Sequence, residues 1–184
     1  AAGQATKTKL CFLKKSGEKF FDEDYRAGFF DSVMLPALDL FGVERSPEAK
    51  NGRHIDNYTY REIVELAKAG HEVPRITVPV AVMRDMQAHL EWKKPVTITL
   101  REHKHWEHRN SNLTDWIRFA EYLQEQGEHV IFLRDYAHAD EDIVGFDTFP
   151  EASKNFLVRA ALYECAKCNL FVSNGPATLG VFGT

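Results

Sequence analysis

Hydrophobic and polar residues follow different patterns on the two sides of residue 93. Before it, apolar side chains recur mainly at helical spacing, which predicts a mainly helical N-terminal part over residues 1–93. The elements expected there are a strand at 9–14, a helix over 29–41 with a kink or a late start at Pro36, a loop at 46–57, a helix at 59–70 and a helix opened by Pro79.

After residue 93, short β-branched runs alternate with amphipathic stretches. Strands are predicted at 96–100, 129–133 and 170–173, where apolar runs stop at charged or turn residues. The predicted helices and loop are a helix from the cap Asn112 to Gly127, a polar loop over 134–151, a helix from the cap Ser153 to about Lys167 and a helix at 177–182. Short connections in this alternation favour an α/β fold with a Rossmann-like doubly wound parallel sheet over residues 94–184.

The composition is that of a folded chain, with 44% hydrophobic and 27% charged residues among 184. A net charge of −4 argues against nucleic acid as a partner. Cys11, Cys165 and Cys168 cannot form a closed disulfide framework, and no apolar run nears the roughly 20 residues that span a bilayer. We therefore expect a cytoplasmic protein without a transmembrane segment. Action at a membrane surface and the oligomeric state stay open.

The two ends of the chain indicate a piece of a longer protein or a processed one. The chain begins at Ala1 rather than at Met, and it stops at Thr184 just after an apolar, helix-like run. We therefore expect the half-domain over 94–184 to be truncated at its C-terminus. Residues 1–93 are expected to be the end or the remnant of another domain.

The carboxyl ends of the predicted strands are the first place to look for chemistry, because ligands bind there in parallel sheets. Segments 101–111, 134–135 and 173–178 are expected to converge at that edge. The last of them reads SNGPAT, with two capping residues, a glycine that allows close approach and a proline suited to a helix start. It would bind an anion on free amides of Ala177, Thr178 and Leu179. The alternative is an ordinary, well-capped turn.

The segment REHKHWEHRNS after the first predicted strand adds two planar cations, Arg101 and Arg109, which suit phosphate oxygens. Arg101 would clamp a diphosphate against the helix start across the sheet edge. Alternatively, it pairs with Glu102 or is solvated. His103, His105 and His108 of this segment do not favour a metal site, because no carboxylate or cysteine partner stands at metal-ligand spacing. They favour a solvated loop, or one histidine that acts as an acid, a base or a phosphate donor.

The helix predicted before the third strand contributes two further candidates. Glu164 lies within the apolar stretch ALYECA and either reaches a ribose diol or faces solvent. Cys165 and Cys168 form a C-x-x-C pair without a second pair or a following histidine. We therefore interpret the two cysteines as small residues that pack under the sheet rather than as a redox or zinc site.

Taken together, these segments resemble a known family. VTITLRE, RNSNLTDWIRFAEYLQEQGEHVIFLRD, the loop ending in FPEAS and RAALYECAKCNLFVSNGPATLGVFG follow one another as in the C-terminal, donor-binding half of GT-B glycosyltransferases. The chain is similar in particular to ADP-heptose:lipopolysaccharide heptosyltransferases and to uncharacterised bacterial glycosyltransferase-like proteins. The resemblance covers residues 94–184, about half of the chain.

The resemblance implies a glycosyltransferase, of hexosyl or heptosyl type, that transfers a sugar from a nucleotide-diphosphate donor to a glycan or another hydroxyl acceptor. We expect no cofactor and no metal, and the resemblance makes residues 1–93 the remnant or the end of an acceptor-side domain. The bases to be considered are Glu102, His103 and His105. Donor and phosphate binding would fall to Arg101, Arg109, Asn110, Ser111, Glu164, Ser173, Asn174, Gly175, Pro176, Ala177 and Thr178.

Two other functions remain open at this point. One is a non-catalytic module that binds a nucleotide or a sugar phosphate, as a degenerate transferase would. The other is a sugar epimerase-like enzyme, which shares the two-domain architecture. The nucleobase, the sugar, the acceptor and the stereochemical outcome are not determined by these patterns.

Overall fold

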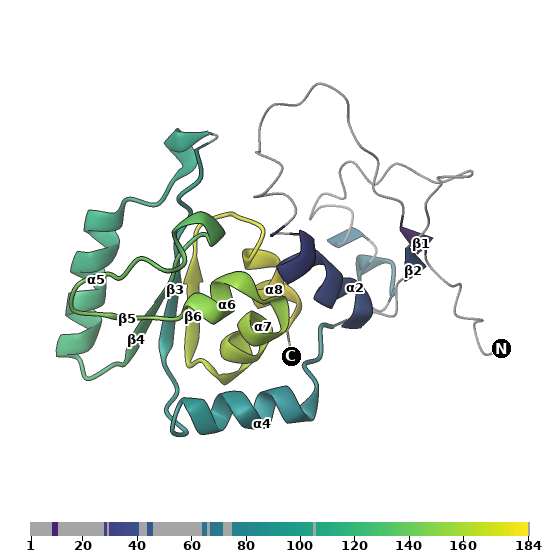
Figure 1. Ribbon diagram of the computed structural model, residues 1–184, viewed down its shortest axis with the longest axis horizontal. Helices are drawn as coiled ribbons and strands as arrows, with labels where there is room; N and C mark the ends of the chain where they lie inside the picture. The colour runs from purple at the N-terminus through teal and green to yellow at the C-terminus, as the bar shows by residue number, and fades with distance from the viewer. Residues whose placement is uncertain are drawn as a thin grey trace.

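A parallel sheet forms the central layer of the fold, with helices on both of its faces (Figure 1). The structure, a computed structural model, describes residues 9–10, 28, 30–40, 44–45, 64–65, 67–71, 75–104 and 106–183. The sheet has four strands in the order β5-β4-β3-β6, and every neighbouring pair is parallel. The strand bounds are Val96–Thr99 for β3, Val130–Leu133 for β4, Asp147–Thr148 for β5 and Cys168–Phe171 for β6. The predicted α/β class is therefore confirmed.

One face of the sheet is covered by helix α5 (Leu113–Glu125), which stands apart from the other helices in Figure 1. Side chains alternate between the two faces along a strand, so Ile98 of β3 and Phe132 of β4 point to the same side as α5. Both side chains are fully buried, and they pack with Ala120 and with the apolar stripe of α5 that the sequence predicted.

The opposite face packs against three helices, α4 (Val80–His89), α6 (Pro150–Lys154) and α7 (Phe156–Cys165) (Figure 1). Ile131 and Leu133 of β4 contribute the strand side of this core. Helix α4 was predicted from Pro79 onward and lies before the expected boundary near residue 93. The core of the sheet therefore extends N-terminal of that boundary.

Helix caps account for one correct and one wrong prediction. The Asn112 side chain accepts a hydrogen bond from the amide three residues later, and Gly127 follows the end of α5 with a φ of 83°. Both features were predicted. The predicted cap at Ser153 is wrong, because Ser153 lies buried inside the short helix α6. Asn155 caps α7 instead, accepting from the Leu157 amide at 2.9 Å.

Two strands differ from the sequence prediction. The short strand β5, Asp147–Thr148, lies within the segment 134–151 that was predicted as a loop. It was not predicted because it is a strand through its pairing with β4 and not through its own residue pattern. β6 begins two residues before the predicted strand. Asn169 is tolerated there because its side-chain oxygen lies 2.6 Å from the Thr97 hydroxyl, on the neighbouring strand.

The described N-terminal residues form short elements. A kink or a late helix start was predicted at Pro36; the structure instead changes from a π-helical turn to helix α2 at Leu35, so Pro36 lies in the first turn of α2 and the chain is already helical before it. The predicted loop at 46–57 and the helix start at residue 59 lie outside the described residues. The element bounds are Lys9–Leu10 for β1, Phe30–Met34 for the π-helical turn η1, Leu35–Leu40 for α2 and Glu44–Arg45 for β2.

The last helix, α8 (Ala177–Phe182), follows β6 through a short turn and contacts α7, as the pattern over 177–182 predicted. Within the part of the chain that is described, none of the helices combines the length and the apolar character needed to cross a membrane.

Candidate functional site

The order of the strands reverses at β3. β4 and β5 lie to one side of it, and β6 lies directly on the other side. The segments that leave β3 and β6 therefore start next to each other at the carboxyl end of the sheet, which is where open α/β sheets bind ligands. Residues 101–111 follow β3 and residues 172–176 follow β6. We call this place the switch point.

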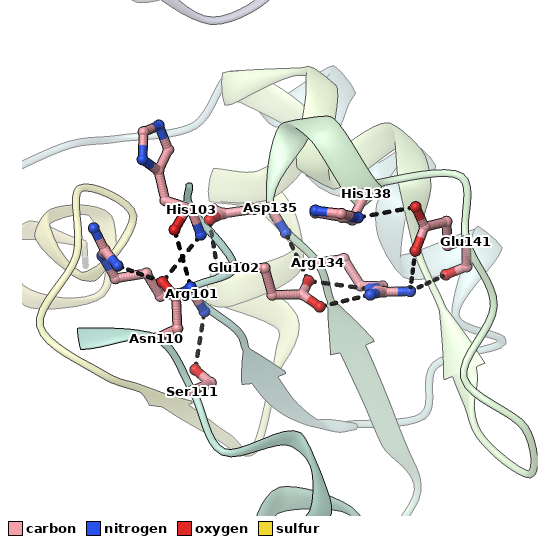
Figure 2. A network of polar contacts seen from close by, with 9 residues as sticks. All are labelled: Arg101, Glu102, His103, Asn110, Ser111, Arg134, Asp135, His138 and Glu141. Atoms are coloured by element: carbon pink, nitrogen blue, oxygen red, sulfur yellow. Dashed lines mark hydrogen bonds and ion pairs between the residues drawn. The ribbon is translucent and has the colours of Figure 1, made fainter. Parts of the chain in front are cut away.

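Residues 101–111 form a closed loop at the switch point (Figure 2). The Ser111 amide donates to the Arg101 carbonyl at 2.8 Å, and the Arg101 amide donates back to the Ser111 hydroxyl at 2.9 Å. Inside the loop, the Asn110 side chain binds both backbone groups of His103, at 2.9 and 3.0 Å. Asn110 and Ser111 therefore hold the loop together, a role that the sequence analysis did not assign to them.

The Arg101 guanidinium is directed into this loop. The side chain is buried, and it donates to the Trp106 carbonyl at 3.1 Å and to the Asn110 side-chain oxygen. The predicted diphosphate clamp placed this cation across the sheet edge, whereas the structure uses it to shape the loop that follows β3. Glu102, the alternative partner considered for Arg101, pairs with Arg134 instead.

Arg109 lies on the outside of the same loop, at the end of the single turn η2 (Glu107–Arg109), and it is exposed. Its Nη2 donates to the Ser173 carbonyl at 3.1 Å, so it joins the segment after β3 to the segment after β6. The guanidinium also lies over the Trp106 ring, 5.5 Å from its centre. Of the two arginines predicted to bind phosphate, Arg109 is thus the one whose guanidinium lies exposed at the switch point.

Glu102 is tied to a neighbouring strand end. Its two carboxylate oxygens accept from Arg134, at 2.5 Å from Nη2 and at 3.0 Å from Nε (Figure 2). Both side chains are largely buried, with 16% and 10% exposed. The hydrogen bond to Glu102 raises the pKa of the Arg134 guanidinium, with Glu141 adding to the effect. A carboxylate held in this way by a permanent cation does not suit the general-base role considered for Glu102.

The other two candidate bases are histidines of the same loop. The His103 ring points away from the network of polar contacts in Figure 2, while its backbone is bound by Asn110. His105 lies outside the described residues. His103 is therefore the candidate base whose side chain the structure leaves directed away from the network.

Beneath the switch point lies a polar group of which the sequence analysis placed only Asp135, in the segment 134–135, without assigning it a role. Asp135, the second residue after β4, accepts from the Glu102 amide at 2.7 Å. Behind it, Arg159 of α7 is 7% exposed and donates from Nε to the Ala152 carbonyl at 2.6 Å. Burial lowers the pKa of the Arg159 guanidinium, and the nearby Asp135 charge opposes this effect. A charged residue inside the apolar run NFLVRAALY was the available signal.

The same group includes a hydroxyl pair between the sheet and α7. The hydroxyl groups of Thr99 and Tyr163 lie 2.6 Å apart, and both side chains are buried. Burial raises the pKa of the Tyr163 phenol, so this hydroxyl stays protonated. The polar side chains of β3 on this face are therefore satisfied within the protein.

The turn between β6 and α8 departs from the anion cradle that was predicted. The Ala177 amide donates to Asn174 Oδ1 at 3.1 Å, the Thr178 amide to the Gly175 carbonyl at 3.1 Å and the Leu179 amide to the Pro176 carbonyl at 3.0 Å. The three amides expected to be free are thus all bonded, because the turn caps itself. Asn174 supplies the cap, and its Nδ2 is buried without a hydrogen-bond partner among the described residues.

Glu164 lies at the other edge of the sheet. Helix α7 runs antiparallel to the strand that follows it, so its last residues lie at the amino ends of the strands. There Glu164 borders a hollow of about 170 Å³. The other residues that border it are Gln87, Cys165 and three residues of the turn between α4 and β3, Trp92, Lys93 and Lys94. Glu164 therefore lies at the opposite edge of the sheet from the switch point.

A larger hollow of about 430 Å³ lies along the first turns of α5, bordered by Asn112, Asp115, Trp116 and Phe119. It begins just after the loop that ends at Ser111, but the residues bordering it are none of those joined at the switch point. We therefore place the candidate site by the strand order and by the contacts between loops rather than by this surface depression.

Metal-ligating side chains do not gather among the residues described: no three or more His, Cys, Asp or Glu are placed to hold an ion. Cys165 ends α7 as a buried thiol, and burial raises its pKa. Cys168 begins β6 and is exposed, so only one of the pair packs under the sheet as predicted.

The chain was also compared with known proteins. No protein-family model matches it, and neither the curated proteins nor the solved structures give a match.

Proposed function

We propose that this chain binds a nucleotide-diphosphate sugar at the switch point and belongs to a protein that transfers the sugar to a hydroxyl acceptor. The observation that carries the proposal is the contact between Arg109 and Ser173, which puts an exposed cation between the segments after β3 and β6. The strand order β5-β4-β3-β6 supports it, since it corresponds to the order 3-2-1-4 of a Rossmann-like sheet.

Three features of the switch point suit a diphosphate. Arg109 uses one guanidinium hydrogen for Ser173, and a guanidinium carries five hydrogen-bond donors in a planar fork. The Asn174 side chain carries a buried Nδ2 donor for which the described residues supply no hydrogen-bond partner. Gly175 leaves open space, because a Cβ built there would meet nothing within 4 Å. A cation, an amide donor and room for close approach would together receive phosphate oxygens.

In the proposed reaction, an acceptor hydroxyl attacks the anomeric carbon and the bond from that carbon to the diphosphate breaks. Negative charge develops on the leaving diphosphate, and Arg109 would stabilise it. The proton of the acceptor hydroxyl needs a base. Glu102 is occupied by Arg134, so this role falls to His103, to His105 or to a residue outside the switch point.

The second candidate function is a non-catalytic nucleotide-binding module. The observation that favours it is the pairing of Glu102 with Arg134, which removes the one carboxylate considered as a base. Binding without turnover is the result that this alternative predicts.

A thermal-shift screen tests the proposal. The full chain is heated with each nucleoside diphosphate and with the corresponding nucleotide sugars. A ligand present at 100 times its dissociation constant stabilises the folded state by about 2.7 kcal/mol, which raises the melting temperature visibly. No shift with any of these compounds at millimolar concentration contradicts the proposal. Release of nucleoside diphosphate from a bound nucleotide sugar, when acceptors are added, separates the transferase from the binding module.

A further inference from the structure

Trp106 has an unusual backbone conformation at the switch point. Its φ and ψ are both 56°, in the left-handed region that residues with a β-carbon rarely adopt. The side chain is large and apolar, yet it is 55% exposed. A strained backbone that directs an aromatic ring outward, at the edge of the sheet where the ligand is proposed to bind, suggests that the ring contacts the ligand.

The surrounding loop holds Trp106 in this conformation. Its carbonyl accepts two hydrogen bonds, from Arg101 Nη1 at 3.1 Å and from the Arg109 amide at 2.9 Å. The Arg109 guanidinium lies over the ring, 5.5 Å from its centre. The buried Arg101 thus fixes the backbone of Trp106, and the exposed Arg109 fixes its ring.

We infer that the Trp106 indole is a stacking platform for the nucleobase of the donor. This inference rests on the proposed function, because it places the base next to the diphosphate site. Arg109 contacts both the indole and Ser173, so one ligand would meet the two at neighbouring points: the base on the ring, the diphosphate on the guanidinium. Stacking is tolerant of base identity, since every base has an aromatic face.

The chain offers a matched control in Trp92. Its φ is 63° and its side chain is 71% exposed, so it shares both the left-handed backbone and the exposure of Trp106. It lies in the turn between α4 and β3, at the amino ends of the strands. A general effect of removing an exposed, strained tryptophan would therefore appear equally at both positions.

The test is titration calorimetry on the full chain with nucleoside diphosphates and with inorganic pyrophosphate. Asparagine tolerates the left-handed region, so Trp106→Asn removes the ring with little strain on the backbone. We expect this variant to weaken nucleoside diphosphate binding by about 5- to 100-fold and pyrophosphate binding by less than about twofold. Trp106→Phe retains most of the affinity, and Trp92→Asn behaves as the wild type.

Fluorescence provides a second measurement that does not depend on Trp106→Asn folding. A stacked base quenches indole emission, so we expect the quenching by a bound nucleoside diphosphate to be lost in Trp106→Phe and retained in Trp92→Phe. Unchanged nucleoside diphosphate affinity in Trp106→Asn, or quenching that survives in Trp106→Phe, overturns the inference and leaves the proposed function standing. Equal losses for pyrophosphate and nucleoside diphosphate also overturn stacking. Failure of the wild-type chain to bind any diphosphate overturns both.

Discussion

Arg109 and Ser173 stand 64 residues apart in the sequence, yet Nη2 of Arg109 donates to the carbonyl of Ser173 at 3.1 Å. This hydrogen bond joins the loop after the central strand β3 to the turn after the edge strand β6. The proposed diphosphate site is defined by that junction, and the first two predictions address its two sides.

Replacing Arg109 by alanine should weaken diphosphate binding by about tenfold or more, since a hydrogen bond to a charged group contributes about 1.5–3 kcal/mol. The melting temperature should change little, because the side chain is exposed. Arg118→Ala is the control, as Arg118 is an exposed arginine on α5. Titration calorimetry measures the affinities, and an Arg109→Ala affinity equal to that of Arg118→Ala removes Arg109 from the site.

Gly175→Ala tests the other side of the junction. A β-carbon at Gly175 meets nothing within 4 Å, so the variant should fold with an unchanged melting temperature. It should nevertheless bind diphosphate several-fold more weakly, because the added methyl group occupies the space that the ligand approaches.

The matched glycine is Gly127, where φ is +83° and a β-carbon also meets nothing. Gly127→Ala should lower the unfolding free energy by about 1 kcal/mol through backbone strain, without any change in the affinity for diphosphate. Full affinity in Gly175→Ala would show that the ligand does not approach this backbone.

Glu102→Gln separates a structural carboxylate from a catalytic one. It leaves the largely buried Arg134 without its bidentate partner, so we expect a loss of about 2–4 kcal/mol in unfolding free energy. Chemical denaturation measures this loss. An unchanged stability, together with a loss of transfer activity and retained donor binding, would instead identify Glu102 as the base.

The hydroxyl pair between Thr99 and Tyr163 predicts strong coupling in a double-mutant cycle. Tyr163→Phe leaves the buried Thr99 hydroxyl without this partner and should cost about 1–3 kcal/mol in unfolding free energy. Thr99→Val should cost a similar amount. The double variant should lose less than the sum, because removing both partners leaves no unpaired hydroxyl between them. Additive losses would mean that the two groups act independently.

The same tyrosine makes the fold sensitive to alkaline pH. The pKa of Tyr163 is raised in the folded protein above its ordinary value of 10.0, so the folded state holds the phenolic proton more tightly. Its contribution is fully present below pH 10.0 and is lost as the pH rises through the folded pKa. Tyr163→Phe should remove this part of the alkaline destabilisation in melting experiments.

Glu141 makes the stability of the fold depend on pH in the opposite direction, at acid rather than alkaline pH. Its pKa is lowered below the ordinary value of 4.5, mainly by its hydrogen bond with His138. The stabilisation it contributes is therefore present above pH 4.5 and is lost as the pH falls through the folded pKa. Wild type and Glu141→Gln should differ in melting temperature at neutral pH and converge in acid. A difference that persists in acid would show that charge is not its cause.

Much of the fold could be predicted from local pattern. The stripe on α5 and its caps at Asn112 and Gly127 follow from residue spacing and from backbone preferences, and both are local. The start of α7 could not be predicted, because Ser153 and Asn155 are both capping residues. Burial of Ser153 decides between them.

The candidate site was predictable as a location but not as a set of contacts. The segments that meet at the carboxyl ends of the strands follow from the parallel order. The direction of each side chain does not: Arg101 turns into its loop, while Arg109 reaches across to Ser173. Both are arginines of the same short segment, so residue type could not distinguish them.

The sequence alone determined the alternation of strands and helices, since periodicity of apolar residues is a property of each segment. It also determined which loops carry charge. Only the tertiary structure decided that β5 joins the sheet, that the amides after Pro176 are already bonded, and that Glu164 lies at the opposite edge from Arg109. The reason is physical: hydrogen-bond partners and burial are fixed by segments distant in sequence, and no local pattern contains them.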